Sequence, residues 1–274
     1  PTPANLEPYG FRDVRRWIDR QMQPERATLL VVSDVAPTPE LWAFIEGEFG
    51  GWSRGGEARP APAAEPPQAD RRRVVLVERA GASQAVLLVG FRTPPRASRD
   101  AAAHGAVEWL LRSRLQERLV MEQGVSYGVL VHVEEQARGA ALVVETAVER
   151  PAAARSLGQI LDTARGLAES PVTPAIAGWA AWQVARGHAL RFDAVRGTAG
   201  ALEEMLLDAR PQDHFETLGD SIASLDPQRI RAAARAMGVG REAAVVVGDR
   251  AALEPQLAAA GYQVAVVPQA AESR

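Results

Sequence analysis

The chain has 274 residues, 47% of them hydrophobic, and a formal net charge of -3, which is typical of an ordinary globular protein with one large domain or two small ones. The pI near 5.9 argues against a nucleic-acid-binding protein, and no apolar run approaches the roughly 20 residues needed to cross a bilayer. Because the sequence contains no cysteine, disulfide frameworks, thiolate metal sites and thiol nucleophiles are excluded.

The start of the chain and its basic residues bear on its origin. The first residue is Pro1 rather than Met, so we expect the natural N-terminus to lie further upstream. All 31 basic residues are arginine, which together with the alanine richness indicates a GC-rich bacterial genome rather than a binding surface. We expect a soluble protein of the bacterial cytoplasm or periplasm, and the sequence does not distinguish the two.

The first quarter of the chain predicts two helices around a strand. Residues 8–22 place apolar side chains on one side and arginines on the other, which predicts a helix. Residues 27–35 are a continuous apolar run, which predicts a strand buried on both faces or packed under helices. Residues 39–52 predict a helix that ends at a glycine pair. Residues 53–70, rich in proline, glycine and alanine, predict an exposed, mobile connection rather than a domain boundary.

Two strands and a long helix are predicted next. Residues 72–79 and 83–92 predict strands, and the short connection Ala80-Gly81-Ala82 between them favours an antiparallel pair. In residues 107–119, apolar side chains recur at steps of three and four, which predicts a helix with one buried stripe. Gly124 can adopt the left-handed conformation that ends such a helix.

A strand begins just after this glycine. Alternation from Ser126 predicts that Tyr127, Val129, Val131 and Val133 lie on one face of the strand and Leu130 and His132 on the other. Residues 140–148 predict a second strand that pairs back through a turn at 136–139. The side chains expected to face the core from the sheet are Val86, Leu88, Val129, Val131, Leu142 and Val144.

The rest of the chain predicts helices and two further strands. The helices are expected at residues 151–167, 173–192, 194–208, 213–225 and 226–237, followed by a strand at 242–247, a helix at 251–260 and a strand at 263–267. The pattern VVSD at residues 31–34 returns as VVVGD at residues 245–249, each time before a helix. An aspartate that closes a strand and caps a helix is common, so we interpret the match as structural rather than as an internal repeat.

One stretch carries a more specific motif. Ser113, Arg114, Leu115, Leu119, Gly124 and Tyr127 fall at the spacings of the pattern S-R-L-x-x-x-L-R-E-x-x-G-L-x-Y. This stretch resembles the insulinase/pitrilysin type of zinc metallopeptidase, which includes the processing peptidases, and it resembles the half that does not hold the metal. The motif's arginine falls here on Val120 and its acidic residue on Met121. The segment FGGW at residues 49–52 is similar to another signature of the family.

The resemblance implies a fold, a domain layout and a site. The fold would be α+β, with a mixed, largely antiparallel sheet and helices packed on one face. Residues 1–26 would be a lead-in helix and linker from a preceding half, and residues 27–274 the non-catalytic peptidase-like domain. Tyr127 would contact substrate. In the family this role is shared by the tyrosine and an arginine, and Val120 stands at the position of that arginine here. Without the resemblance, Tyr127 would be an aromatic packed at a helix-strand corner with its hydroxyl bonded to backbone.

The sequence lacks the residues that catalysis in this family needs. An H-x-x-E-H helix holds the zinc and activates the bound water, and no such segment occurs. The four histidines, at positions 104, 132, 188 and 214, are widely separated. We therefore expect no cofactor in this chain and no activity of the chain alone. The resemblance implies zinc in a partner half, either in the same polypeptide or in a separate subunit, and a peptide substrate.

Two functions fit these observations. The chain would be the non-catalytic half of an insulinase-type peptidase, which closes the substrate chamber and contacts substrate. The alternative is a catalytically inactive structural or interaction subunit of the same family, which the loss of the arginine at Val120 favours. A stand-alone small-molecule enzyme would need convergent polar groups that the sequence does not show, and no dinucleotide-binding fingerprint follows a predicted strand.

Overall fold

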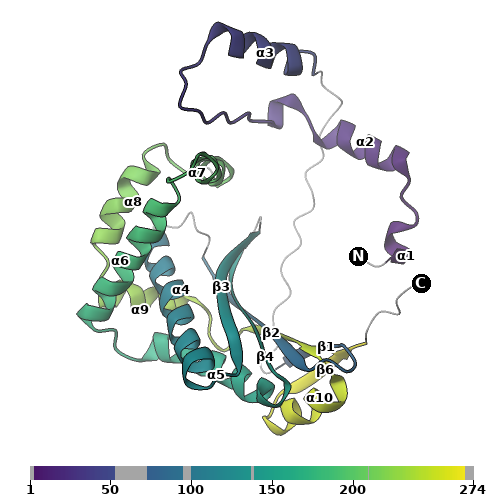
Figure 1. The fold of residues 1–274 in the computed structure, drawn as a ribbon, viewed down its shortest axis with the longest axis vertical. Coiled ribbons are helices and arrows are strands. Elements are labelled where there is room, and N and C mark those ends of the chain that lie inside the picture. The colour runs from purple at the N-terminus through teal and green to yellow at the C-terminus, as the bar shows by residue number, and fades with distance from the viewer. Residues whose placement is uncertain (1–2, 53–72, 95–99, 137–138, 209, 269–274) are drawn as a thin grey trace. The chain divides into compact units, whose positions relative to one another are not determined.

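The chain forms two units, which are described separately (Figure 1). The computed structural model describes residues 3–52, 73–94, 100–136, 139–208 and 210–268. The helical unit comprises Pro1–Ala64 and Arg191–Leu207, and the sheet unit comprises Glu65–Leu190 and Asp208–Arg274. The predicted connection at residues 53–70 lies outside the described residues. None of the helices in the described ranges combines the length and the hydrophobicity that a membrane span requires.

The helical unit is made of separate short helices. Its elements are α1 (Pro3–Leu6), α2 (Phe11–Gln21), the 3-10 turn Pro24–Arg26, α3 (Pro39–Phe49) and α7 (Val195–Leu207). The helices predicted at residues 8–22 and 39–52 are therefore confirmed. Thr38 caps α3, because its hydroxyl accepts a hydrogen bond from the Leu41 N–H. No residue of α2 or α3 is buried.

The strand predicted at residues 27–35 does not form, and this prediction was wrong. Leu29 and Val31 are 54% and 51% exposed. Within the described residues, no backbone N–H or C=O of residues 28–34 takes part in a backbone hydrogen bond. An apolar, β-branched run has the propensity for a strand, but a strand exists only where neighbouring strands pair with its backbone groups.

The sheet unit is built on a six-stranded mixed sheet with the order β3-β4-β2-β5-β1-β6. Its strands are β1 (Arg73–Glu78), β2 (Gln84–Thr93), β3 (Ser126–Gln136), β4 (Gly139–Glu149), β5 (Ala243–Gly248) and β6 (Gln263–Val267). Neighbours from β3 to β5 are antiparallel, whereas β5, β1 and β6 are parallel. The β3–β4 hairpin is confirmed. The expected β1–β2 pair is not, because β5 lies between these strands and pairs with both.

Helices cover one face of this sheet, as the resemblance implied (Figure 1). They are α4 (Ala101–Leu115), α5 (Ala153–Glu169), α6 (Pro174–Leu190), α8 (His214–Ala223), α9 (Pro227–Ala236) and α10 (Arg250–Ala259). α4 contacts β3, α5 contacts β2 and β4, and α10 contacts β1 and β6, while α6, α8 and α9 pack on these helices. The α+β fold is therefore confirmed, and so are the helices predicted after residue 150.

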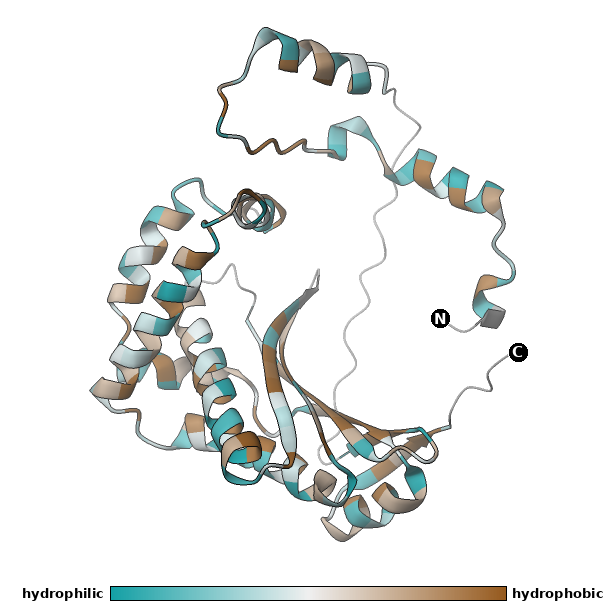
Figure 2. Cartoon of the chain, in the orientation of Figure 1, coloured by the Kyte–Doolittle hydropathy of each residue, from teal (hydrophilic) through white to brown (hydrophobic). Residues whose placement is uncertain are grey.

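Alternation along the strands gives the sheet a covered face and an open face. Side chains buried on the covered face include Val74, Leu76, Ala85, Leu87, Val89, Phe91, Val129, Val131, Leu142, Val144 and Val246. Partly exposed aliphatic side chains on the open face include Val75, Val77, Val86, Leu88, Val245 and Val247. The strands are consequently hydrophobic along most of their length (Figure 2).

This division corrects one part of the predicted core. Four of the expected residues, in β3 and β4, are buried as predicted: Val129, Val131, Leu142 and Val144. Val86 and Leu88 were assigned to the wrong face, because Leu87 is the fully buried neighbour and they lie on the open side. Residues 85–89 are an unbroken apolar run, so their sequence contains no alternation from which the buried face could be identified.

The two faces of β2 should respond differently to truncation. Leu87→Ala removes a fully buried side chain and should lower the free energy of unfolding by about 2–5 kcal/mol. Leu88→Ala, the matched control one residue away, should cost much less because its side chain is already partly in water. Urea unfolding of both variants measures the difference, and equal losses would contradict the assignment of faces.

The stability of the chain should also depend on the protonation of His104 in α4. Burial lowers the pKa of this imidazole, and the charge of Asp100 offsets part of that effect. Because the folded pKa lies below the unfolded value of about 6.5, unfolding takes up a proton and stability falls as the pH drops through that value. We expect His104→Gln to reduce the loss of thermal stability on acidification. An unchanged loss in the variant would show that His104 does not contribute.

Candidate functional site

The motif stretch lies where α4 turns into β3. After Leu115 the helix widens into a π-helical turn, Gln116–Glu122, whose buried Leu119 continues the apolar stripe of α4. Gly124 ends the helix with φ at +62°, a conformation that a residue with a Cβ rarely adopts. The Val125 N–H donates to the Leu119 carbonyl across this glycine, so the chain reverses tightly into the sheet.

The first residues of β3 form a β-bulge. Ser126 pairs with Val148 and Val129 pairs with Thr146, so Tyr127 and Gly128 together lie opposite a single residue of β4. The hydroxyl oxygens of Ser126 and Thr146 lie 2.8 Å apart, and they lie 2.9 and 2.8 Å from the Gly128 carbonyl oxygen. Both side chains are buried, so this polar cluster fixes the shape of the bulge from beneath.

The bulge turns Tyr127 away from the protein. Its side chain is 93% exposed, and its hydroxyl bonds to no described residue. The sequence pattern had placed Tyr127 on the same face as Val129 and Val131, and this was wrong because the extra residue in the bulge interrupts the alternation. The geometry also differs from that of a packed aromatic whose hydroxyl bonds to backbone.

The two positions at which the motif departs from the family carry uncharged side chains. Val120, at the place of the family's arginine, is partly buried against the core, and Met121 is 76% exposed. Burial lowers the pKa of the Arg114 guanidinium, which forms no hydrogen bond or ion pair with a described residue. Gln116 was not singled out from the sequence, yet its Oε1 accepts a hydrogen bond from the Val129 N–H at 3.2 Å. A side-chain contact between residues this far apart in sequence leaves no periodic signal.

Beyond the bulge, the open face of β3 carries a short polar row. His132 Nε2 lies 3.3 Å from Glu134 Oε1, and Leu130, one position nearer the bulge on this face, is 52% exposed. Glu145 of β4 pairs with Leu130 on one side and with Leu88 on the other, which places its carboxylate on the same face. The open face is therefore mainly aliphatic, with a few ionisable groups near one edge.

The histidines do not form a metal site. In the described part of the chain, no group of three histidine or acidic side chains lies close enough to hold a metal ion. The structure does bring two distant histidines, His188 and His214, to one ring, that of Phe215. Burial and the nearby Arg210 guanidinium, whose Nη1 lies 3.0 Å from the His214 Nε2, lower the pKa of His214. A neutral imidazole that accepts from arginine is consistent with a structural contact.

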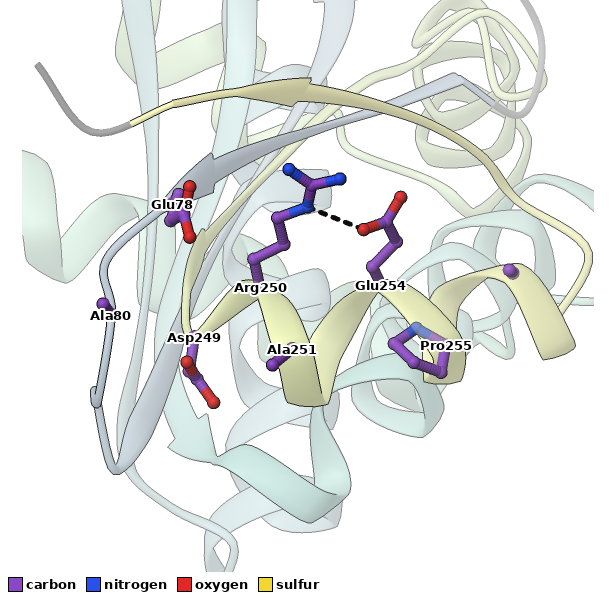
Figure 3. Close-up of a pocket in the computed structure, with 8 residues that line it drawn as sticks. Glu78, Ala80, Asp249, Arg250, Ala251, Glu254 and Pro255 are labelled. Carbon is purple, nitrogen blue, oxygen red and sulfur yellow. Dashed lines mark hydrogen bonds and ion pairs between the residues drawn. The ribbon is translucent and has the colours of Figure 1, made fainter.

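A shallow hollow of about 540 Å³ lies beside α10 (Figure 3). Three of its four charged side chains are bonded to other protein groups: Arg250 Nε donates to Glu254 Oε2 at 2.8 Å, and Asp249 accepts from the Gly81 N–H and contacts Arg150. These groups hold α10 against the ends of β1 and β2 and leave no convergent set of donors or acceptors among the lining residues. The motif stretch is therefore the stronger candidate site.

Comparison with known proteins identifies the family. The family model described as peptidase M16 inactive domain matches residues 11–177, which is more than half of the chain. No curated protein matches the chain in sequence.

Solved structures share the fold. A protease from Helicobacter pylori has a TM-score of 0.77 at 16% identity, over 90% of this chain and 61% of its own. A peptidase M16 inactive domain from Pseudomonas fluorescens has a TM-score of 0.65 at 16% identity, over 78% of this chain and 52% of its own. The periplasmic protease PqqL from Escherichia coli has a TM-score of 0.56 at 11% identity, over 76% of this chain and 24% of its own.

The chain thus spans about half to three fifths of the first two of these structures, and these identities establish a shared fold only. The family match covers the helix, the bulge and the β3–β4 hairpin that carry the motif stretch. On this match, the chain belongs to the peptidase M16 inactive-domain family.

Proposed function

We propose that this chain is the non-catalytic half of an M16-type zinc metallopeptidase, which closes the substrate chamber of a zinc-bearing half and contacts the peptide through Tyr127. The observation that carries the proposal is the geometry of Tyr127, which is 93% exposed and held outward by a buried Ser126–Thr146 cluster. An exposed aromatic whose backbone is already held by a hydrogen-bonded bulge is suited to contact a ligand, because only its side-chain torsions are ordered when it binds.

The chemistry available to Tyr127 is donation of one hydrogen bond. A neutral phenol can donate to a peptide carbonyl oxygen as negative charge develops there. The family's second donor is missing, since Val120 cannot replace a guanidinium. Tyr127 would therefore position the carbonyl and stabilise charge on it alone, while the open face of the sheet would exclude water from the chamber.

The metal that this family uses does not fit the described residues of this chain. They contain no group of three close ligands, and the sequence has no H-x-x-E-H segment. No step of the reaction is therefore assigned to a metal held here. The zinc, its ligands and the general base would belong to the partner half, in the same polypeptide or in a separate subunit.

The isolated chain should bind no stoichiometric zinc and cleave no peptide, because it lacks both the ligand pair and the general base. Metal analysis after dialysis, together with an assay on unstructured peptides, measures both properties. Turnover that a chelator abolishes in a clean preparation would overturn the assignment of catalysis to another half.

The substitution Tyr127→Phe tests whether the Tyr127 hydroxyl contacts substrate or stabilises the fold. The thermal midpoint of the chain should hardly change, because the hydroxyl bonds to no described residue. Loss of one preorganised donor lowers kcat by about 10²–10³-fold, and a donor that works without its arginine partner should be worth less than that. We expect a loss of turnover in the enzyme reconstituted with its zinc-bearing half.

Tyr9→Phe is the matched control, because Tyr9 is also exposed, at 67%, and lies in the helical unit. It should leave turnover unchanged. If Tyr127→Phe lowers the thermal midpoint and leaves turnover intact, Tyr127 is a structural residue and the proposed contact is wrong.

One observation favours a second function, that of a catalytically inactive structural or interaction subunit. Val120 stands where substrate contact would call for arginine, and it packs partly against the core. In that case the open aliphatic face of the sheet would bind a protein surface rather than a peptide. Full turnover of the reconstituted enzyme with Tyr127→Phe, at unchanged stability, would favour this function.

A further inference from the structure

The chain makes an excursion out of the sheet unit between α6 and α8. It leaves the sheet unit after Leu190, forms α7 as part of the helical unit, and returns at Asp208. α7 is therefore joined to the sheet unit by one connection at each of its ends. The side chains beside the exit and the return decide how firmly these two connections are held together.

The side chains at the exit and the return contact one another. His188 lies near the end of α6, and its ring centroid is 5.7 Å from that of Phe215. His214 is the first residue of α8, and its ring centroid is 5.1 Å from that of Phe215. α6 and α8 also pack on each other. One phenylalanine ring thus contacts an imidazole from the exit and an imidazole from the return.

Arg210 holds the return segment onto α8. Its side chain is only 8% exposed, and its Nε donates to Asp208 Oδ2 at 2.9 Å. Its Nη1 lies 3.0 Å from His214 Nε2. A guanidinium has donors only, so Nε2 accepts and the imidazole is neutral, with its proton on Nδ1. This hydrogen bond therefore exists only while His214 is uncharged.

Protonation of His214 replaces this hydrogen bond by a repulsion. An imidazolium has no acceptor, so its Nε2 proton would face a guanidinium of the same charge. The charged ring would gain a cation–π contact with Phe215. That attraction is the smaller effect, because Arg210 is buried and loses an acceptor at the same time as it meets a second cation.

The charges around His214 act in both directions. Burial is the first cause that lowers the pKa of His214, followed by the charges of Arg210 and His188, while Asp208 and Asp213 raise it in part. Asp208 is already paired with Arg210, which limits its effect on the imidazole. The balance favours the neutral ring.

α4, the other helix that packs on α8, directs its nearest ion pair to the opposite end of α8. Asp100 lies 3.6 Å from the Arg229 guanidinium, which in turn donates to Ser221 and Ser224 at the end of α8. This pair is almost the length of the helix away from His214. The charge of Asp100 is therefore not the partner of His214.

We propose that His188, Arg210, His214 and Phe215 form a pH-sensitive clamp, the histidine clamp, which ties the two ends of the α7 excursion together at neutral pH and opens when His214 takes up a proton. Because the neutral form is favoured in the closed clamp, opening takes up a proton. The clamp is closed above the ordinary histidine pKa of about 6.5 and is lost progressively as the pH falls below it. This inference does not depend on the proposed contact of Tyr127 with substrate.

Hydrogen exchange on the full chain tests the clamp between pH 8 and pH 5. The amides of His214 and Thr217 bond to the carbonyls of Pro211 and Asp213, so they report on the return segment. After correction for the intrinsic change of exchange rate with pH, their protection should fall by up to about tenfold per pH unit below about pH 6.5, as expected for uptake of one proton. The amides of β5, the internal control, should stay protected.

Substitutions separate the clamp from general acid sensitivity. His214→Gln keeps an acceptor for Arg210 but cannot take up a proton, so its local protection should be the same at pH 5 as at pH 8. Arg210→Gln removes the donor and should weaken local protection at every pH. His104→Gln, the matched control, removes the other histidine whose pKa burial lowers and should leave the local loss as in the wild type.

Titration of the four imidazoles by nuclear magnetic resonance gives a second measurement that needs no stable His214 variant. The His214 resonance should titrate below pH 6.5 in the wild type, and its midpoint should rise in Arg210→Gln because a neighbouring cation is removed.

Three results would overturn the proposal. The first is equal protection of the His214 and Thr217 amides at pH 8 and pH 5. The second is the same loss in His214→Gln as in the wild type, and the third is a parallel loss in β5, which would mean that the whole sheet unit opens rather than the clamp.

Discussion

The sheet unit depends on the pairing of β5 with the two strands on either side of it. β1 and β2 lie next to each other in sequence, yet each hydrogen-bonds to β5, which comes more than a hundred residues later. Four of the six strands, β1 to β4, and the first helices of the unit therefore precede β5 in the sequence. β5 is the strand that joins β1 to β2 in the sheet. Contacts of such large sequence separation are costly in chain entropy, because they close long loops.

The candidate site depends on a local irregularity, the β-bulge at the start of β3, in an otherwise regular strand. Leu119 and the apolar stripe of α4 anchor the helix, Gly124 reverses the chain, and Ser126 with Thr146 holds the bulge. Tyr127 is exposed and does not belong to the packed core, whereas Ser126 and Thr146 next to it are buried and hydrogen-bonded to each other. Such support beneath an exposed aromatic is what the proposed contact with a ligand requires.

The sequence predicted most of the elements, because helical and strand periodicities in the sheet unit are set by burial on one side. It failed where the outcome depends on residues far away in the chain. Nothing in residues 72–92 indicates that β5 separates the two strands, and the apolar run in β2 does not identify its buried face. The propensity of residues 27–35 for a strand is real, but pairing partners decide whether a strand forms.

The site was predictable only where it depends on local sequence. The motif marked Tyr127 and the glycine before it, which are local features. The bulge depends on the contact between the hydroxyls of Ser126 and Thr146, which lie 20 residues apart, and on the Gln116 side chain that reaches across to Val129. Such contacts follow from tertiary structure and not from alternation.

The bulge in β3 has one more consequence, which concerns solubility. β3 and β6 are the two edges of the sheet, where unpaired backbone groups invite other strands to add. β6 is only five residues long. β3 begins with the bulge, and further along its open face it carries His132 and Glu134. A regular strand from another molecule cannot match this register at its start. The irregularity that turns Tyr127 outward thus also protects the longer edge of the sheet against polymerisation into continuous β-structure.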